Sequence, residues 1–559
     1  MDKFDLLEPE LLYTRELKDK HHENVVKYFD KLVEKSKIDV EANKSTCNKY
    51  YKECENLENL QKKLRKLKAL QVLFIFLCLL IVGIFLLIFV YKPRRKILDE
   101  EIAKQETKVK KLLDEAWSQM APLNRLFESS IPSKIMETTT PLIDMDRIFD
   151  VKKYELLRDK YGMWDNSDEN SSTLDLQSGN ILGNPFVIFK DVNKRMVMQR
   201  YEGTLMISYY RGYGKDRTLV HETLHAHIER PKPVYSKETY LVYGNEAANH
   251  LTFSRTPSCI NSLKDEKEID KYVRRHEKDL TKLAEKSMKK GGNYTPLGNS
   301  EFELFFGGLD RNNEVEYRLL FTPLAQKSML QVLKSKIGFG DDFTFLKENG
   351  LNVITSAHSQ GTALFVDIEA FKGFDFEKVK DFFIDYNDHY FKCLFFDFAP
   401  LLSIPLYQQH KAHEYIYKNN VGSNFTCFSH EVLANKFSDS TFRPANGKTD
   451  LILKTSIERK EGETDVVKVT SHSHNMINRT ELVPVFGGDG HTHMVPVNWI
   501  EYVPVQAEGE FSVSDLGTDD EVKFRSFGHN DVIYAKGLVS QQTLNVDIKQ
   551  LKSLMAKED

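Results

Sequence analysis

An uninterrupted apolar run near the N-terminus restricts what this chain can fold into more than any other feature. It reads ALQVLFIFLCLLIVGIFLLIFVY over residues 69–91, and residues 72–90 carry neither a charge nor a strong hydrogen-bonding side chain. A helix that rises about 1.5 Å per residue needs about 20 residues to cross about 30 Å of hydrocarbon. Because 68 residues precede the run, its position excludes a signal peptide. The run predicts one transmembrane helix over 69–91, inserted in the lipid bilayer of the cell membrane.

The basic residues that flank this run do not determine its orientation. Lys62, Lys63, Arg65, Lys66 and Lys68 precede it, and Lys92, Arg94, Arg95 and Lys96 follow it. The positive-inside rule compares the two flanks of a span, and here they nearly cancel. We therefore expect a single-pass protein and leave open the side of the membrane on which its C-terminal body lies.

Charged helices are expected on both sides of the run. Residues 1–68 form a charged helical region, in which Leu57, Leu60 and Leu64 recur at helical spacing. A coiled-coil hairpin within this region would lead into the span. Residues 92–130 then form a juxtamembrane helical stalk, with apolar side chains separated by charges at helical spacing. The helical regions also offer surfaces through which the chain could form a homo-oligomer.

Beyond the stalk, the sequence has the pattern of strands separated by turns. Runs rich in β-branched and aromatic residues, such as NPFVIFK, TLMISYY and TYLVY, alternate with Gly, Pro, Asn and Asp. Helices are expected over 262–290, from Pro323 onward, and from a cap at Asp375 to Pro400. A further strand is expected near 362–369. These patterns predict an antiparallel-sheet-rich α+β domain over residues 131–424.

The last part of the chain is expected to be rich in strands. ELVPVFGGDGHTHMVPVNWIEYVPV places a Gly-Gly-Asp-Gly turn between two alternating segments, which is a strong hairpin signal, and its prolines suit edge strands or bulges. Residues 543–559 predict a strand that leads into a helix. A β-rich C-terminal domain over 425–559 completes a fold of class α+β: N-terminal helices, one transmembrane helix, a stalk and an antiparallel body.

The segment LVHETLHAHIE, residues 219–229, contains the H-E-x-x-H pattern of zinc peptidases. On a helix, His221 and His225 would share a face and hold one zinc ion, while Glu222 acted as the general base. Glu246 would supply the third protein ligand that a catalytic zinc site needs. These four residues define an alternative function, that of a membrane-tethered zinc metallopeptidase.

The periodicity of the same segment favours a strand. From Val220 to Glu229 the even positions are apolar except for Glu222, and the odd positions are polar, which is the alternation of a half-buried strand. On a strand, His221 and His225 lie about 13 Å apart, whereas a zinc–nitrogen bond is about 2.1 Å long. We therefore prefer a strand that carries no catalytic residue, no metal ligand and no cofactor.

Composition narrows the remaining classes of function. The chain has 78 basic and 82 acidic side chains, so its charge gives no reason to expect nucleic-acid binding. Its six cysteines contain no CxxC pair, which favours free thiols over disulfides or a zinc knuckle. The pairs His472–His474 and His491–His493 are better explained as surface histidines than as metal ligands.

Several segments of the chain resemble a known group of proteins. They are YRGYGKDRTLVHETLHAHIERPKPVY (210–235), FGGLDRNNEVEYRLLFTPLAQKSML (306–330), FFDFAPLLSIPLYQ (395–408) and FGGDGHTHMVPVNWIEYVPV (486–505). The group consists of uncharacterised membrane proteins of mycoplasmas and other mollicutes, and the layout of residues 95–395 is also similar to that of a wider bacterial membrane-protein family of unknown function. The resemblance implies a membrane protein and transfers no catalytic residue or cofactor. The wider family typically has two membrane helices, whereas one is expected here.

Together these features predict a single-pass membrane-anchored protein without catalytic activity. The 559-residue chain is 41% hydrophobic, which is enough to build well-packed domains. Its body contains no convincing catalytic set apart from the zinc-peptidase pattern. The expected role is that of an interaction or scaffold protein at the cell membrane, with a protein partner that the sequence does not identify.

Overall fold

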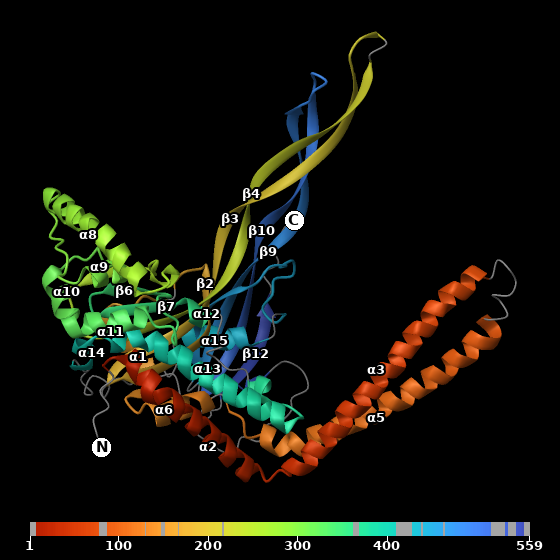
Figure 1. The fold of residues 1–559 in the computed structure, drawn as a ribbon, viewed down its shortest axis with the longest axis horizontal. Coiled ribbons are helices and arrows are strands. Elements are labelled where there is room, and N and C mark those ends of the chain that lie inside the picture. The colour runs from red at the N-terminus through yellow and green to blue at the C-terminus, as the bar shows by residue number, and fades with distance from the viewer. Residues whose placement is uncertain are drawn as a thin grey trace. The chain divides into compact units, whose positions relative to one another are not determined.

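The structure is a computed structural model, and its described residues have an α+β fold (Figure 1). The described residues are 7–77, 87–128, 130–146, 151–165, 167–214, 217–360, 368–409, 427–437, 440–461, 464–515, 532–534 and 544–552. They contain helices and two antiparallel sheets, which confirms the predicted α+β class. The chain divides into two compact units. The helical unit is Arg15–Thr139 with Ala363–Lys392, and the sheet unit is Met1–Thr14, Thr140–Thr362 and Cys393–Asp559.

The helical unit is built around an apolar stripe on helix α2. Its elements are α2 Lys18–Ser36, α3 Val40–Leu77, the π-helical turn η3 Leu87–Tyr91, α5 Lys92–Asn124, α6 Ile131–Thr139, the 3-10 helix η6 Ile368–Phe371 and the first part of α13 Phe376–Leu402. Val25, Phe29 and Leu32 share one face of α2 because they are three or four residues apart. They pack against buried side chains that include Leu123 and Phe383.

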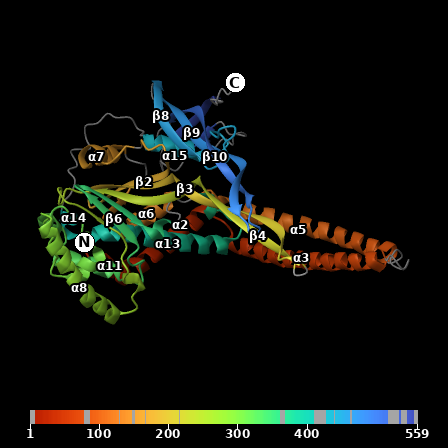
Figure 2. The same ribbon diagram turned by 90° about the horizontal axis from the view of Figure 1, so that it is seen from above.

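Helices α3 and α5 run side by side in opposite directions, as both views show (Figures 1 and 2). Far along this pair, Lys108 of α5 forms an ion pair with Glu53 of α3. At its end, the Tyr91 hydroxyl donates a hydrogen bond to the side-chain oxygen of Gln71. The sequence predicts a coiled-coil hairpin within residues 1–68, but the partner of α3 is α5. The predicted hairpin within 1–68 is therefore wrong. Helical spacing shows that a helix has an apolar stripe, but it does not show which other helix covers that stripe, and here the partner follows the apolar run.

The two ends of the apolar run lie together. A single straight helix over 69–91 would hold Gln71 and Tyr91 about 30 Å apart, yet they are hydrogen-bonded. The short separation of the two described ends therefore does not fit the straight single-pass span that the sequence predicts. The middle of the run, residues 78–86, lies outside the described residues. Within the described part of the chain, no helix has both the length and the apolar character needed to cross a membrane.

The sheet unit contains two antiparallel sheets and the remaining helices. The first sheet has the order β1-β2-β3-β4-β7-β6-β5, with β1 Ile143–Met145, β2 Ser171–Ile181, β3 Asn184–Arg211, β4 Thr218–Gly244, β5 Thr252–Arg255, β6 Phe343–Glu348 and β7 Leu351–Ser356. The second has the order β11-β12-β10-β9-β8, with β8 Ile452–Glu461, β9 Thr464–Phe486, β10 Thr492–Asp515, β11 Val532–Tyr534 and β12 Leu544–Lys552. The helices of this unit are α1 Pro9–Leu12, α7 Val151–Tyr161, η5 Ile260–Ser262, α8 Glu266–Lys289, α9 Ser300–Phe306, α10 Glu314–Leu320, α11 Pro323–Leu333, α12 Ala357–Gln360, the end of α13, α14 Pro405–Gln409 and α15 Cys427–Lys436. The π-helix η1, Tyr13–Leu17, contains the boundary between the two units.

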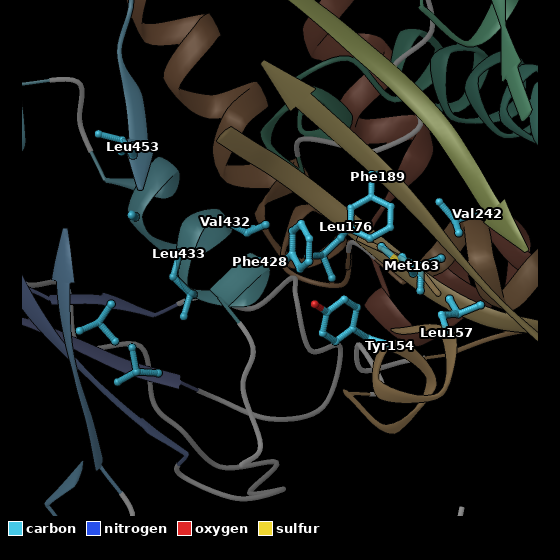
Figure 3. Packing of buried hydrophobic residues seen from close by; sticks show 14 of the residues in the cluster. Tyr154, Leu157, Met163, Leu176, Phe189, Val242, Phe428, Val432, Leu433 and Leu453 are labelled. Carbon is cyan, nitrogen blue, oxygen red and sulfur yellow. The ribbon is translucent and has the colours of Figure 1, made fainter. Parts of the chain in front are cut away.

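A hydrophobic core joins the two sheets through α15 (Figure 3). The ring of Phe428 on α15 lies 5.2 Å, between centroids, from the rings of both Tyr154 on α7 and Phe189 on β3. Val432 of α15 and Leu453 of β8 are buried in the same cluster. Burying one large apolar side chain contributes about 1.5–3 kcal/mol, so this core links both sheets into one unit.

Local sequence signals locate most of the predicted helices correctly. Asp265 caps α8 by accepting a hydrogen bond from the Glu268 backbone N–H at 2.9 Å, and α11 begins at Pro323 as predicted. Asp375 accepts from the backbone of the first turn of α13 at 3.1 Å, but this helix does not end at Pro400 and instead continues to Leu402. Proline removes only its own N–H donor, so the residues after it can still complete a last turn.

Two further predictions fall largely outside the described residues. Residues 362–367 of the strand expected at 362–369 lie outside the described residues, and residues 368–371 form the 3-10 helix η6. In the tail, the predicted strand is present as β12, whereas residues 553–559, where a helix is expected, are not among the described residues.

His21 of α2 is buried within the helical unit. One ring nitrogen of His21 lies 3.0 Å from the Thr139 hydroxyl and the other 3.2 Å from the Asn387 carbonyl oxygen. The ring stacks on Phe391 with centroids 4.0 Å apart. Burial lowers the pKa of His21 to about 3.

We predict that the helical unit loses stability as the pH falls from about 6.5 towards 3. Because the folded pKa lies below the unfolded value, the unfolded chain binds a proton that the folded chain does not, and stability rises with pH across this window. The contribution is at most about 1.4 kcal/mol per pH unit. Urea unfolding followed by far-ultraviolet circular dichroism should show this slope, and His21→Gln should reduce it. The exposed neighbour His22, substituted as His22→Gln, serves as the control. An unchanged slope in His21→Gln would contradict the assignment.

Candidate functional site

Two pairs of strands extend beyond their sheets as long ribbons, as Figure 1 shows. Strands β3 and β4 stay paired out to Arg211 and Thr218, although β4 pairs with β7 only over 241–244. Strands β9 and β10 stay paired out to Phe486 and Thr492. We call residues 194–211 with 218–235 the first ribbon, and residues 473–486 with 492–505 the second ribbon.

The two ribbons pack against each other through their inner faces. Leu224 and Ala226 of the first ribbon and Val495 and Val497 of the second form a buried apolar cluster. The backbones approach closely at Gly203, where an added Cβ would lie 2.2 Å from the Pro496 carbonyl oxygen. An isolated two-stranded ribbon is marginally stable in water, so each ribbon stabilises the other.

The residues of the zinc-peptidase pattern lie on β4 in the first ribbon. From His221 to Glu229 the odd positions are exposed, whereas Leu224 and Ala226 are buried. This alternation confirms the predicted strand. His221 and His225 therefore lie about 13 Å apart on the outer face, and only the His221 ring has a described partner nearby, the Ser208 hydroxyl at 2.7 Å.

Glu222 and Glu246 are separated from these histidines. Glu222 points to the inner face, where its carboxylate accepts a hydrogen bond from the Gly488 backbone N–H at 2.8 Å. Glu246 follows the other end of β4, about 60 Å along the strand from His225, and forms an ion pair with Lys160. The structure does not bring the four residues together, because strand geometry sends alternate side chains to opposite faces. They do not form the zinc-peptidase site.

The other histidine pairs are also far apart. His472 pairs with Gln506 near the base of the second hairpin, whereas His493 pairs with Val485 near its turn. Thirteen residues of extended strand separate Val485 from His472, which corresponds to about 43 Å. In the described part of the chain, no group of three or more His, Cys, Asp or Glu side chains is arranged to hold a metal ion, and no described cysteine forms a disulfide.

A buried cluster around His358 contains the residue types of a hydrolase triad but not its geometry. One ring nitrogen of His358 lies 2.8 Å from an Asp342 carboxylate oxygen, and the other lies 3.1 Å from the Cys393 carbonyl oxygen. Burial lowers the pKa of His358, but the carboxylates of Asp342 and Asp397 outweigh this effect and raise it overall. The Ser359 hydroxyl donates to Asp397 at 2.5 Å and not to the imidazole. Both ring nitrogens face acceptors, so this histidine has no nitrogen with which to accept a serine proton.

The outer face of the second ribbon carries an apolar patch, which we call the ribbon patch. It consists of Leu482, Pro484, Phe486, Met494 and Pro496. The strand register sets Leu482 opposite Pro496 and Pro484 opposite Met494, so the side chains form adjacent rungs of one ladder. Phe486 is 70% exposed, Leu482 56% and Met494 49%.

The ribbon patch is a surface that the sequence alone does not predict. One sequence feature could have indicated the patch. In ELVPVF, residues 481–486, apolar residues stand at both even and odd positions, whereas a strand with one buried face needs them only at alternate positions. Only the pairing of β9 with β10 and the packing of the inner face against the first ribbon show which parity remains exposed.

Comparisons of the chain with protein-family models, curated proteins and solved structures found no match. The geometry of the residues themselves therefore carries the functional argument.

We predict opposite effects for two neighbouring substitutions on β4. Leu224→Ala removes a buried side chain from between the ribbons and is expected to destabilise them by about 2–5 kcal/mol. His225→Ala truncates an exposed side chain and should change stability by less than about 0.5 kcal/mol. Hydrogen–deuterium exchange of the ribbon amides in the full chain measures both. A larger effect from His225→Ala, together with loss of bound zinc, would mean that the segment is a metal-binding helix.

Proposed function

We propose that the protein is a membrane-anchored, non-catalytic interaction protein. The apolar run at 69–91 holds it to a lipid bilayer, and the ribbon patch binds an apolar surface of a partner protein. The observation that carries this proposal is the exposed ladder of Leu482, Phe486 and Met494 with its two prolines. The mollicute membrane-protein resemblance is consistent with the proposal and remains a prediction.

Keeping the ribbon patch in water has a free-energy cost. Exposed apolar area costs about 25 cal/mol per Å², and a contiguous apolar patch on a protein surface commonly marks an interaction site. The patch lies on a two-stranded ribbon, whose inner face already buries Val495 and Val497. The outer face therefore remains for another molecule to cover.

Prolines favour binding to the face of the ribbon over strand addition at its edge. Pro484 lies within β9, and Pro496 and Pro504 lie within β10, in an otherwise continuous antiparallel register. Proline cannot donate a ladder hydrogen bond, so at these positions the free edges lack the N–H that a new strand would need. A partner that buries the apolar rungs of the ribbon patch avoids this obstacle.

The apolar run supports attachment to a membrane. At its described ends, Leu70, Ile88 and Phe89 are exposed, the last by 62%. Water solvates such side chains poorly, and each buried CH2 group gains about 0.8 kcal/mol on transfer to hydrocarbon. Contact with lipid therefore accounts for a stretch of 19 residues that has no charge to keep it in water.

A non-catalytic role is consistent with the structural contacts that the candidate catalytic side chains make. Glu222 supports the contact between the ribbons, and the nitrogens of His358 are occupied by hydrogen-bond acceptors. The partner is a second protein or a second copy of this chain.

A photo-crosslinking residue at position 486 is expected to form a covalent adduct with the partner in intact cells, because Phe486 lies at the exposed end of the ribbon patch. Position 498, an exposed polar site on the same ribbon, is the matched control and should give none. An adduct with the mass of two chains would identify the partner as a second copy. Equal adducts at both positions, or none at 486, would contradict the proposed surface.

Removal of residues 72–90 is expected to release the protein from the membrane fraction of cells, because this deletion removes the uncharged core of the apolar run. Cell fractionation with an alkaline wash measures the shift. A matched deletion in the charged helix α8 should leave the protein in the membrane fraction. If the protein without 72–90 still sediments with membranes, the anchor lies elsewhere.

A further inference from the structure

The contacts between α3 and α5 are symmetric about the middle of the apolar run. Gln71 contacts Tyr91, Glu53 contacts Lys108, and the Gln119 side chain donates to the Thr46 hydroxyl at 3.1 Å. The midpoint of each pair lies near residue 81, which is also the centre of residues 72–90. Both flanks of the run therefore lie at the same end of one helical pair.

This arrangement brings the two basic flanks of the run together. We call the following residues the basic collar: Lys62, Lys63, Arg65, Lys66 and Lys68 of α3, and Lys92, Arg94, Arg95 and Lys96 of α5. All of them are exposed, and residues 61–71 and 92–98 contain no acidic residue. On a straight span, the two basic groups would lie on opposite sides of the bilayer. On the helical pair, they combine at the base of the apolar run.

A hollow opens at the level of the basic collar. It has a volume of about 660 Å³, and its lining includes three basic residues, Lys92, Arg95 and Lys96, and two acidic residues, Asp99 and Glu100. Arg95 lies 3.5 Å from the Asp99 carboxylate, which neutralises part of the local charge. The remaining ammonium and guanidinium groups suit phosphate oxygens, which Arg binds in a bidentate manner and Lys as a point charge.

The meeting of the two described ends determines how the run can enter lipid. Because Gln71 and Tyr91 are hydrogen-bonded to each other, the chain must enter and leave the bilayer through the same face. The basic collar, which adjoins these two ends, would then lie at the headgroup level of that face.

We propose that the run at 69–91 enters the bilayer from one side only, and that the basic collar binds the anionic phosphate headgroups of that leaflet. This inference rests on the proposed membrane anchoring and adds to it a lipid class and a topology. The N-terminal region and the C-terminal body lie on the same side of the membrane, where anionic lipid attracts both basic groups.

Binding of the full chain to vesicles tests the lipid class. Vesicles that contain phosphatidylglycerol should bind the protein more tightly than vesicles of phosphatidylcholine alone. The triple variant Lys63→Gln, Lys66→Gln and Arg94→Gln should weaken binding to the anionic vesicles about a hundredfold, since each basic residue near the surface contributes about fivefold. Its binding to phosphatidylcholine vesicles should not change.

The matched control places the same loss of charge farther from the run, at Lys52→Gln, Lys104→Gln and Lys110→Gln on the same two helices. An equal loss of binding in this control would overturn the role of the collar. Equal binding of the unmodified chain to both vesicle types would overturn headgroup recognition and leave membrane anchoring intact. Binding to neither vesicle type would refute the anchoring itself.

Protease protection in intact cells tests the topology. Epitope tags at the two ends of the chain should be either both digested or both protected, because both flanks of the run return to one side. Digestion of one tag alone would establish a single-pass span and overturn the one-sided hairpin, while the proposed membrane anchoring would stand.

Discussion

The face-to-face packing of two β-ribbons is the interaction that decides which faces of the ribbons remain exposed. Leu224 and Ala226 meet Val495 and Val497, while Gly203 allows the backbones to come close. A two-stranded ribbon exposes both faces to water and is marginally stable by itself. Once the inner faces are paired, the outer faces are defined, and the ribbon patch becomes a surface instead of a core. The same packing determines the role of Glu222, whose carboxylate holds the turn of the opposite ribbon through the Gly488 N–H.

A second pairing has comparable consequences in the helical unit. Helices α3 and α5 lie antiparallel, and their contacts bring Gln71 and Tyr91 together at the ends of the apolar run. The basic residues of the two flanks, which nearly cancel as an orientation signal, then lie together at one end of the helical pair. Electrostatic attraction to a lipid surface decays within about a Debye length, so nine basic residues within one short zone act together. The arrangement of two helices thus places both basic flanks at one end of the helical pair, which is the surface that we propose to bind lipid headgroups.

Much of the local structure follows from the sequence because its causes are local. The cap at Asp265, the first-turn Pro323, the Gly-Gly-Asp-Gly hairpin and the alternation over 219–229 all involve residues within a few positions of one another. The α+β class follows from the same signals. The partner of α3 could not be predicted in this way, since residues more than 50 positions apart form that contact. The end of α13 at Leu402 was missed because proline weakens a helix without always ending it.

The sequence by itself determined that an apolar run interrupts a charged helical region, and that HETLH lies on a strand. Periodicity suffices for these conclusions, because hydrophobic spacing reports directly on which side of a strand or helix faces water. Tertiary structure decided that the two ends of the run meet, that Glu246 lies far from His225, and that Phe486 faces outward. These facts depend on which distant segments pack together, and many pairings of similar apolar stripes satisfy the same local pattern. The free energy of burying one particular face against another selects among these pairings. That free energy depends on the packing of the whole folded chain and not on any one segment.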